Sequence, residues 1–442
     1  MSSGVFLMYD RRKTPPWIVR RQRLLVGVLV LVVLGTGTLY LIQHRSASVL
    51  EAKLARLRSS GVPLTYQEVL KTPTSGEPIA APKEGTIVVP AVFEDQQLRQ
   101  LYDDFHYAPG LPADLLQRGG AVLERYAELL LRAHLKIRLP DGGIEHEALR
   151  RMSEWFQCKY GDAGVLFLIE AMAAAERGEP DIAFESIALG LASSWDFRNS
   201  FGTLQALMLR GLFTDAQLGE LAGMVGDMRV DESQSLGYRR VEGLKVLAES
   251  GEFLRRYSGL TVDKYLPGTT QFLLNAGELV GYSTQQQARF LEGLEQIEAC
   301  YGVPRPEGVA QMRSIADGVL GAVVPSTSNI MLMSSVHGFT NQLIHESRIN
   351  AMTGCVAIER FHRVEGRFPS QWSELSPGYL AQSPEDPCTG APLRYRTTTD
   401  GYTIYSVGLD QNDDHGAHQT NVRELWNDGD YVLIEYPGAY KP

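Results

Sequence analysis

The chain has 442 residues, of which 44% are apolar and 21% are charged. These are ordinary values for a protein that folds around a core, and the length allows two or three domains. The net charge of −10 argues against a general nucleic-acid binder, because neutralising phosphates requires a basic surface.

Residues 24–42 form an apolar run without a charge, LLVGVLVLVVLGTGTLYLI. At about 1.5 Å per residue, a helix of this length spans roughly 28 Å, close to the hydrocarbon thickness of a bilayer. The basic residues of segment 1–23 predict a cytoplasmic tail, so the body after the span is expected to be extracytoplasmic (periplasmic) on the inner membrane. A cleaved signal peptide is the alternative, since Ser46-Ala47-Ser48 supplies small residues, although its apolar region is normally shorter.

A membrane-proximal helix and a linker are expected over residues 43–90. Apolar residues at helical spacing predict a helix over 48–60, with Gly61 at its C-cap. The proline- and glycine-rich segment 71–90 has the composition of a linker.

Residues 91–344 are expected to form an α-helical domain. Helices over 164–177 and 181–192 flank Gly178-Glu179-Pro180, which resembles one TPR-like hairpin. Without repeats of fixed period, an irregular bundle and a short superhelix both fit. Further helices are expected over residues 121–137, 203–212, 215–229, 233–250, 285–299 and 306–322.

The sequence pattern changes from helical to mixed in residues 345–442, which are expected to form an α+β domain. A helix over 350–365 is stopped by Gly366, and strands are predicted over 393–397, 402–406 and 431–435. The fold class is therefore multi-domain: a transmembrane helix, a mainly α middle domain, and a C-terminal domain with a small antiparallel sheet.

The C-terminal region resembles the globular domain of the major pseudopilin of type II secretion. The resemblance rests on ERFHRVEGRFP at 359–369, PEDPCTGAPLRY at 384–395 and DGYTIYSVGLDQNDDHG at 400–416, followed by Trp426 and Asp430. It implies the fold of this region. It does not imply assembly into a filament, because the apolar run lies about 300 residues upstream instead of continuing into the domain's helix.

The whole chain also resembles a group of membrane-anchored proteins common in planctomycetes and related bacteria. These join a membrane helix, a GVPLTYQEVL-type segment, an alanine-rich helical domain and a pseudopilin-like tail. No biochemical role carries over from this group.

A calcium site is the one cofactor hypothesis. In major pseudopilins the loop after the YSxGxD strand binds calcium, and calcium takes six to eight oxygen ligands. A solvated acidic turn is the alternative, and a transition metal held by His415 and His418 is a weaker one. The matching residues, which the resemblance implies as structural metal ligands, are Ser406, Asp410, Asn412, Asp413 and Asp414, with Asp428 and Asp430 further along the chain.

Motifs for catalysis are missing from the sequence. His345-Glu346 and His146-Glu147 begin like HExxH, but Ile349 and Arg150 stand where the second histidine belongs. There is no GxSxG, P-loop or GxGxxG motif after a strand. The nine histidines are scattered, and a lone histidine on a helix is expected to be a surface or satisfied core residue.

Four cysteines lack CxxC spacing, which argues against a zinc or thioredoxin-like site. Up to two disulfides fit an oxidising compartment, with Cys355–Cys388 as one candidate, and buried thiols are the alternative.

The sequence thus favours a non-enzymatic, membrane-anchored scaffold with a protein partner and no nucleic acid. An envelope-polymer hydrolase with its site in the helical domain, or an accessory part of a secretion system, are the alternatives.

Overall fold

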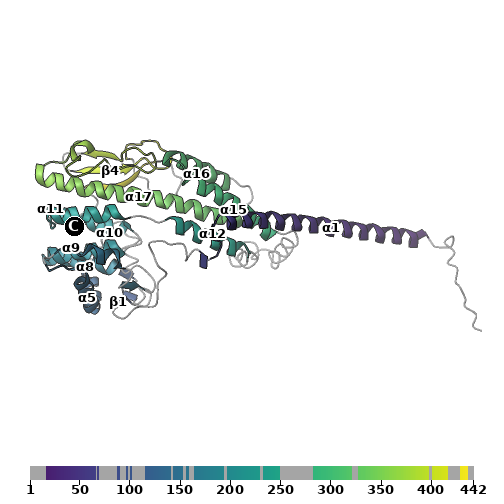
Figure 1. Ribbon diagram of the computed structural model, residues 1–442, viewed down its shortest axis with the longest axis horizontal. Helices are drawn as coiled ribbons and strands as arrows, with labels where there is room; N and C mark the ends of the chain where they lie inside the picture. Colours follow the sequence, from purple (N-terminus) through teal and green to yellow (C-terminus); the bar gives the residue numbers. More distant parts are fainter. Residues whose placement is uncertain are drawn as a thin grey trace, which may run out of the picture. The chain divides into compact units, whose positions relative to one another are not determined.

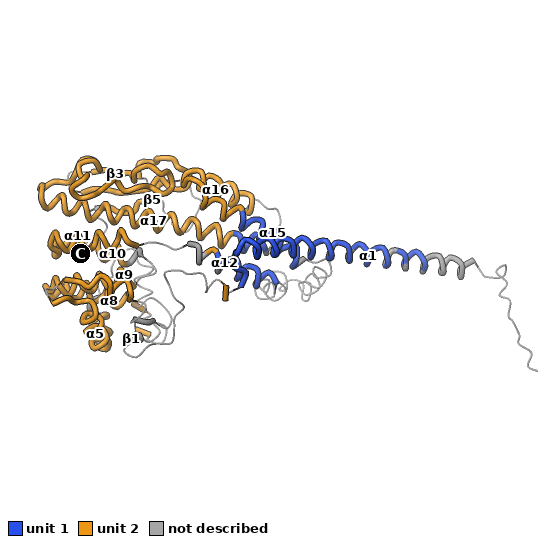
Figure 2. The backbone as a smooth tube through the Cα atoms, in the orientation of Figure 1, with its two compact units in different colours: residues 1–66, 237–295, 322–332 blue, residues 67–236, 296–321, 333–442 orange. Residues whose placement is uncertain are grey.

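In the computed structural model, the chain divides into two compact units (Figure 2). Unit 1 comprises residues 1–66, 237–295 and 322–332, and unit 2 comprises residues 67–236, 296–321 and 333–442. The structure describes residues 16–65, 67–68, 87–89, 96–97, 100–101, 115–140, 143–152, 156–158, 164–193, 197–228, 232–248, 282–320, 327–397, 401–416 and 429–436. Most of the expected linker, 71–90, lies outside the described residues.

Unit 1 contains the long N-terminal helix α1 (Pro16–Ser59), most of α12 (Glu232–Ala248) and most of α15 (Tyr282–Ala299), all labelled in Figure 1. Among the described residues, α1 is the one helix long and apolar enough to cross a membrane. The described side chains of its apolar run are exposed, with Leu34 and Leu41 exposed by 62% and 68%. The predicted apolar helix is therefore confirmed.

The end of α1 confirms the expected cap at Gly61. Gly61 adopts a φ of +72°, and its N–H donates to the carbonyl of Arg58 while the N–H of Val62 donates to that of Leu57. This pair of bonds is a Schellman motif, which satisfies carbonyls left free at a helix end. Val62 and Leu57 belong to one small apolar cluster, so the cap also fixes the direction of the chain beyond the helix.

Unit 2 is mostly helical and is built around one continuous hydrophobic core. Alanine- and leucine-rich faces of its helices are buried here, as the helical periodicity predicts. Its helices include α4 (Leu115–Arg125), α5 (Ala127–Ile137), α6 (His146–Arg150), α8 (Gly164–Arg177), α9 (Pro180–Ser193), α10 (Phe197–Leu209), α11 (Asp215–Asp227) and α16 (Arg305–Leu320). Helix α17 (Thr327–Glu365) belongs to this unit from residue 333 onward.

The hairpin of α8 and α9 has the turn that the sequence predicts. Gly178, with a φ of +73°, closes α8, and Pro180 is the first residue of α9. The two helices approach closely at Gly190, where a Cβ atom would lie 2.6 Å from a methyl carbon of Leu168. Only glycine fits at that contact without displacing the leucine.

A two-stranded parallel sheet was not predicted. Strand β1 (Ile87–Val89) pairs with β2 (Phe156–Cys158), so the end of the expected linker is a strand. The pairing joins segments about 70 residues apart, and three residues are too few to show strand periodicity.

The C-terminal region has the expected sheet. Strands β3 (Arg394–Thr397), β4 (Tyr402–Ser406) and β5 (Tyr431–Tyr436) form an antiparallel sheet in the order β3-β4-β5. Helix α17 runs unbroken through position 345, and the core of unit 2 includes residues from both sides of that position. The bidentate pair of Arg360 with Asp215, at 2.7 and 2.9 Å, joins α17 to α11.

A buried carboxylate fixes the loop before the sheet. Asp386 is 1% exposed and accepts hydrogen bonds from the N–H of Cys388, the hydroxyl of Ser406 and the N–H of Val407. It therefore holds the PEDPC loop against the end of β4. The Asp-Pro and Tyr-Ser-Val-Gly sequence patterns are therefore in direct contact through Asp386.

Candidate functional site

The acidic loop predicted to bind calcium follows β4. Residues 407–416 and 429–430 are described, and His418 and Trp426 lie outside the described residues. Two hydrogen bonds join its ends: the N–H of Gly429 donates to Asp410 (3.1 Å), and the N–H of Gly416 donates to Asp430 (2.6 Å). Asp410 and Asp430 thus hold the two ends of the loop together.

Two of the predicted ligands have other partners. The hydroxyl of Ser406 donates to Asp386 at 2.9 Å, which turns it away from the acidic loop. One oxygen of Asp413 accepts from Tyr405 and from the N–H of His415, and the other pairs with Arg394 at 3.0 Å. Burial alone would raise the pKa of Asp413, but these donors and the charge of Arg394 lower it.

Asp430, which follows the five predicted ligands in the sequence, is the most unusual acid of the loop. It is 0% exposed, and its Oδ1 atom is buried without a hydrogen-bond partner in the described part of the chain. Burial raises its pKa, hydrogen bonds from the backbone of Gly416 and Asp414 oppose that rise, and the charges of Asp413 and Asp414 add to it. The loop therefore contains a carboxylate oxygen that lacks a positive partner.

The oxygen donors that this loop offers differ from the predicted set. Asp410, Asp414 and Asp430 supply carboxylate oxygens, and Asn412 adds an amide, whereas Ser406 and Asp413 are engaged elsewhere. In the described conformation, no group of three or more His, Cys, Asp or Glu residues is arranged to hold a metal ion. A cation would therefore have to draw these side chains together.

A second charged cluster lies in the core of unit 2. His134 of α5 contacts Glu185 of α9 through Nδ1 (2.6 Å) and Glu170 of α8 through Nε2 (2.9 Å). The guanidinium of Arg138 donates two hydrogen bonds to Glu185, at 2.6 and 2.7 Å, and Ser186 donates one to Glu170 at 3.0 Å. We call these five residues the His134 cluster.

The charges of the His134 cluster are balanced internally. Burial alone would lower the pKa of His134, but hydrogen bonds and charge from Glu170 and Glu185 outweigh it and raise the pKa to about 9. Burial alone would raise the pKa of Glu185, but His134 and Arg138 lower it. At neutral pH the cluster thus contains two cations and two carboxylates.

The same cluster has the residue types of a hydrolase triad, because the ring of His134 lies between the hydroxyl of Ser186 and the carboxylate of Glu185. The chemistry does not work, because a triad histidine must be neutral to accept the serine proton. His134 is protonated at neutral pH, and the Ser186 hydroxyl is 3.4 Å from its ring but donates to Glu170. Ser186 is also 0% exposed, so substrate has no access to it. The cluster is a structural element joining three helices.

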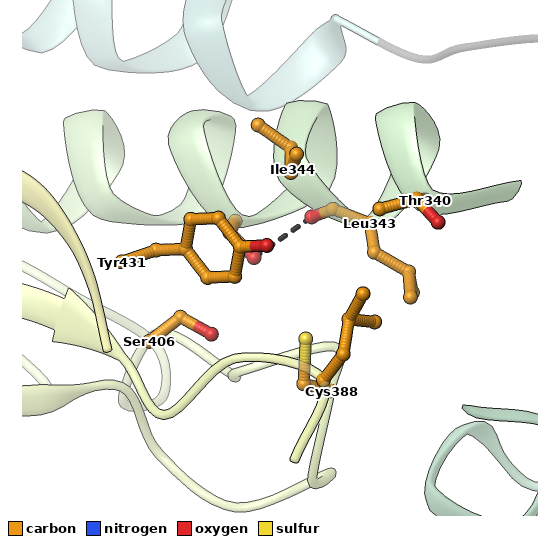
Figure 3. A pocket seen from close by; sticks show the side chains of 8 residues that line it. Thr340, Leu343, Ile344, Cys388, Ser406 and Tyr431 are labelled. Atoms are coloured by element: carbon orange, nitrogen blue, oxygen red, sulfur yellow. Dashed lines mark hydrogen bonds between the residues drawn. The ribbon is translucent and has the colours of Figure 1, made fainter. Parts of the chain in front are cut away.

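The two C-terminal cysteines, Cys355 and Cys388, do not bond to each other. Among the described cysteines, Cys300, Cys355 and Cys388 are free and buried, so the candidate disulfide is not formed. Cys355 contacts the hydroxyl of Tyr402 at 3.2 Å, whereas Cys388 faces a small pocket between α17 and the sheet (Figure 3). That pocket is lined mainly by apolar side chains such as Leu343, and it contains no charged group.

The His134 cluster was missed at the sequence level, although its signal is visible. Glu185 interrupts an otherwise apolar helix face, and every residue from 183 to 191 is buried. An acid in such a position requires a cationic partner, because burying a lone charge is costly. The sequence does not say which of the scattered histidines and arginines supplies it.

Comparisons with known proteins yield no relative. No family model matches the chain, and neither the curated proteins nor the solved structures show a significant match.

Proposed function

We propose that this chain is a single-pass, membrane-anchored scaffold with its N-terminus in the cytoplasm and its body outside. The observation that carries the proposal is the exposed apolar stretch of α1, of which none is buried inside the protein. Exposing so many large apolar residues to water is unfavourable, whereas a bilayer covers them. The basic segment 1–23 supplies the orientation.

The scaffold role follows from what the charged groups do. The buried ions of the His134 cluster neutralise one another, and the bidentate pair of Arg360 with Asp215 joins two helices. Such groups position helices, and each charged group in these two sets already has a partner of opposite charge. We therefore propose that the body binds a protein partner instead of transforming a substrate.

The C-terminal region is proposed to be a pseudopilin-like module that binds a structural calcium ion. The buried, unpartnered oxygen of Asp430 and the acids crowded around it support this. Asp410, Asp414 and Asp430 would hold the ion with Asn412, and the ion would offset their mutual repulsion. Calcium would stabilise the folded loop and take no part in catalysis.

Membrane insertion is tested on the full chain by alkaline carbonate extraction and vesicle flotation. Val33→Arg with Leu34→Arg places two charges in the apolar run, each costing about 3 kcal/mol in a bilayer. We expect the parent chain to float with vesicles and the variant to be released. Val49→Arg is the matched control, since Val49 is an exposed apolar residue of α1 beyond the run. Release of the parent chain by carbonate would contradict the proposal.

A further inference from the structure

Helix α1 does not end where the apolar run ends. It continues through residues 43–59 without a break, and no glycine or proline interrupts it between Gly37 and Gly61. The hydroxyl of Ser46 donates to the carbonyl of Ile42, a local bond that leaves the helical ladder in place. The segment just beyond the proposed span is therefore a stiff helix.

The extension of α1 packs into unit 1. Leu50 and Leu57 are 8% and 6% exposed, and they form an apolar cluster with Ala288 and Leu291 of α15. Leu54 and the capping residue Val62 pack against the same cluster. The apolar residues of the extension recur at helical spacing because they form this contact face.

Two ion pairs set the register and direction of the contact. Lys53 pairs with Glu292 at 3.3 Å, and Arg56 pairs with Glu295. Both pairs have the same separation of 239 residues, so α1 and α15 run in the same direction. Residue 282, where α15 begins, is then level with residue 43, the first residue after the apolar run.

We infer that α1 and α15 form a rigid two-helix stalk, and that unit 1 rests directly on the outer surface of the lipid bilayer. The inference rests on the proposed membrane insertion. It adds that unit 1 contacts the lipid surface, and it gives the height of unit 1 above the bilayer. Leu50, the first buried contact, is eight residues beyond Ile42, or about 12 Å along the helix. The polar headgroup layer accounts for roughly 5–8 Å of that height.

A flexible tether would have a different composition. Glycine- and serine-rich linkers behave as random coils, whereas the segment from Gln43 to Ser59 is helical and half of it is docked. The stalk therefore fixes both the distance and the orientation of unit 1 relative to the bilayer surface.

The test measures height on the full chain in nanodiscs. A donor dye is attached at Arg289→Cys, an exposed position on α15, and acceptor dyes are attached to the lipid headgroups. The parent chain without the added cysteine reports background labelling. Co-purification of the chain with the discs is checked first, because its failure would overturn the membrane proposal itself.

The decisive variant inserts seven helix-forming residues, Ala-Glu-Ala-Ala-Lys-Ala-Ala, after Ala47. Seven residues make nearly two turns, so the docking face keeps its direction and the donor rises by about 10 Å. A Gly/Ser insert of the same length at the same place is the matched control. We expect a short, narrow distance distribution for the parent, a shifted and equally narrow one for the helical insert, and a broad one for the Gly/Ser insert.

A second variant tests the docking contact. Leu50→Ala with Leu57→Ala weakens the apolar cluster and should broaden the distribution, whereas Val49→Ala, an exposed neighbour, should not. The inference is overturned if the chain co-purifies with the discs and all five labelled proteins give one broad distribution. In that case the membrane proposal stands and the rigid stalk does not.

Discussion

The His134 cluster and the acidic loop both contain several carboxylates, but they differ in how far neighbouring positive charges compensate them. In the cluster, Glu170 and Glu185 face His134 and Arg138 at hydrogen-bond distance, so buried charges cancel. In the loop, Asp430 is fully buried with one oxygen unpartnered, and burial raises its pKa, with a further contribution from the charges of nearby acids. Arg394 neutralises only Asp413.

The difference indicates where a bound cation would add stability. A charge-balanced buried cluster is complete within the chain and serves structure, and removing one partner leaves another charge uncompensated. A group with surplus negative charge would be stabilised by a bound cation.

Replacing Glu185 by alanine should be the most damaging change. It leaves His134 and Arg138 without their shared carboxylate in the core of unit 2, so we expect a loss of about 3–5 kcal/mol in the free energy of unfolding. Glu147→Ala is the control, because Glu147 is exposed and 3.6 Å from Arg150. Denaturant unfolding measures both, and equal effects would contradict the assigned role of the cluster.

The pH dependence of stability should follow His134. Its pKa is raised from 6.5 to about 9, so its contribution is fully present below pH 6.5 and is lost as pH rises through 9. A shift of this size is of the order of 3 kcal/mol. The denaturant concentration at the unfolding midpoint should decrease as the pH is raised from 7 to 9.5, and this decrease should be smaller in His134→Gln. An unchanged slope in the variant would show that other groups cause it.

Calcium should stabilise the parent chain and not a loop variant. At about 100 times its dissociation constant, a bound ion adds roughly 2.7 kcal/mol, seen as a higher melting temperature than in EDTA. Asp414→Asn with Asp430→Asn should abolish the shift. Asp227→Asn with Asp317→Asn changes the net charge equally at exposed positions of other helices and should keep it. A shift that survives the loop variant would place the ion elsewhere.

Removing Arg394 should have the smallest effect on stability and a measurable one on calcium. Its pair with Asp413 is partly exposed, so Arg394→Gln should cost less than about 1 kcal/mol. Because the change frees Asp413 and leaves the loop more negative, the calcium affinity should rise. Arg150→Gln, at an exposed position on α6, is the control. Unchanged affinity in a calcium titration would mean that Asp413 lies outside the ion's reach.

Local patterns predicted the local structure of this protein. The strand at 402–406 and the turn around Gly178 were predicted correctly, because alternation and glycine with a following proline act within a few residues. The cap at Gly61 was also predicted, whereas the continuity of α1 from span to cap was not. Nothing in the intervening residues stops a helix, and the docking on α15 that stabilises it lies about 240 residues away.

The candidate sites depended on pairings that the sequence does not show. Ser406 was expected beside the acids, but its hydroxyl contacts Asp386, which the resemblance did not single out. Asp430 reaches the loop only because β5 returns beside β4. The His134 cluster joins α5, α8 and α9, and such partners are defined by packing instead of spacing.

The most direct test of the account is a measurement of topology in intact cells. Single cysteines are introduced at Ser2 in the basic tail and at Glu51, an exposed position on α1 beyond the apolar run, and a membrane-impermeant thiol reagent is added. We expect labelling of Glu51→Cys in intact cells, and of Ser2→Cys only after the membrane is permeabilised. Labelling of Ser2→Cys alone in intact cells, or of neither, would contradict an anchor with an external body.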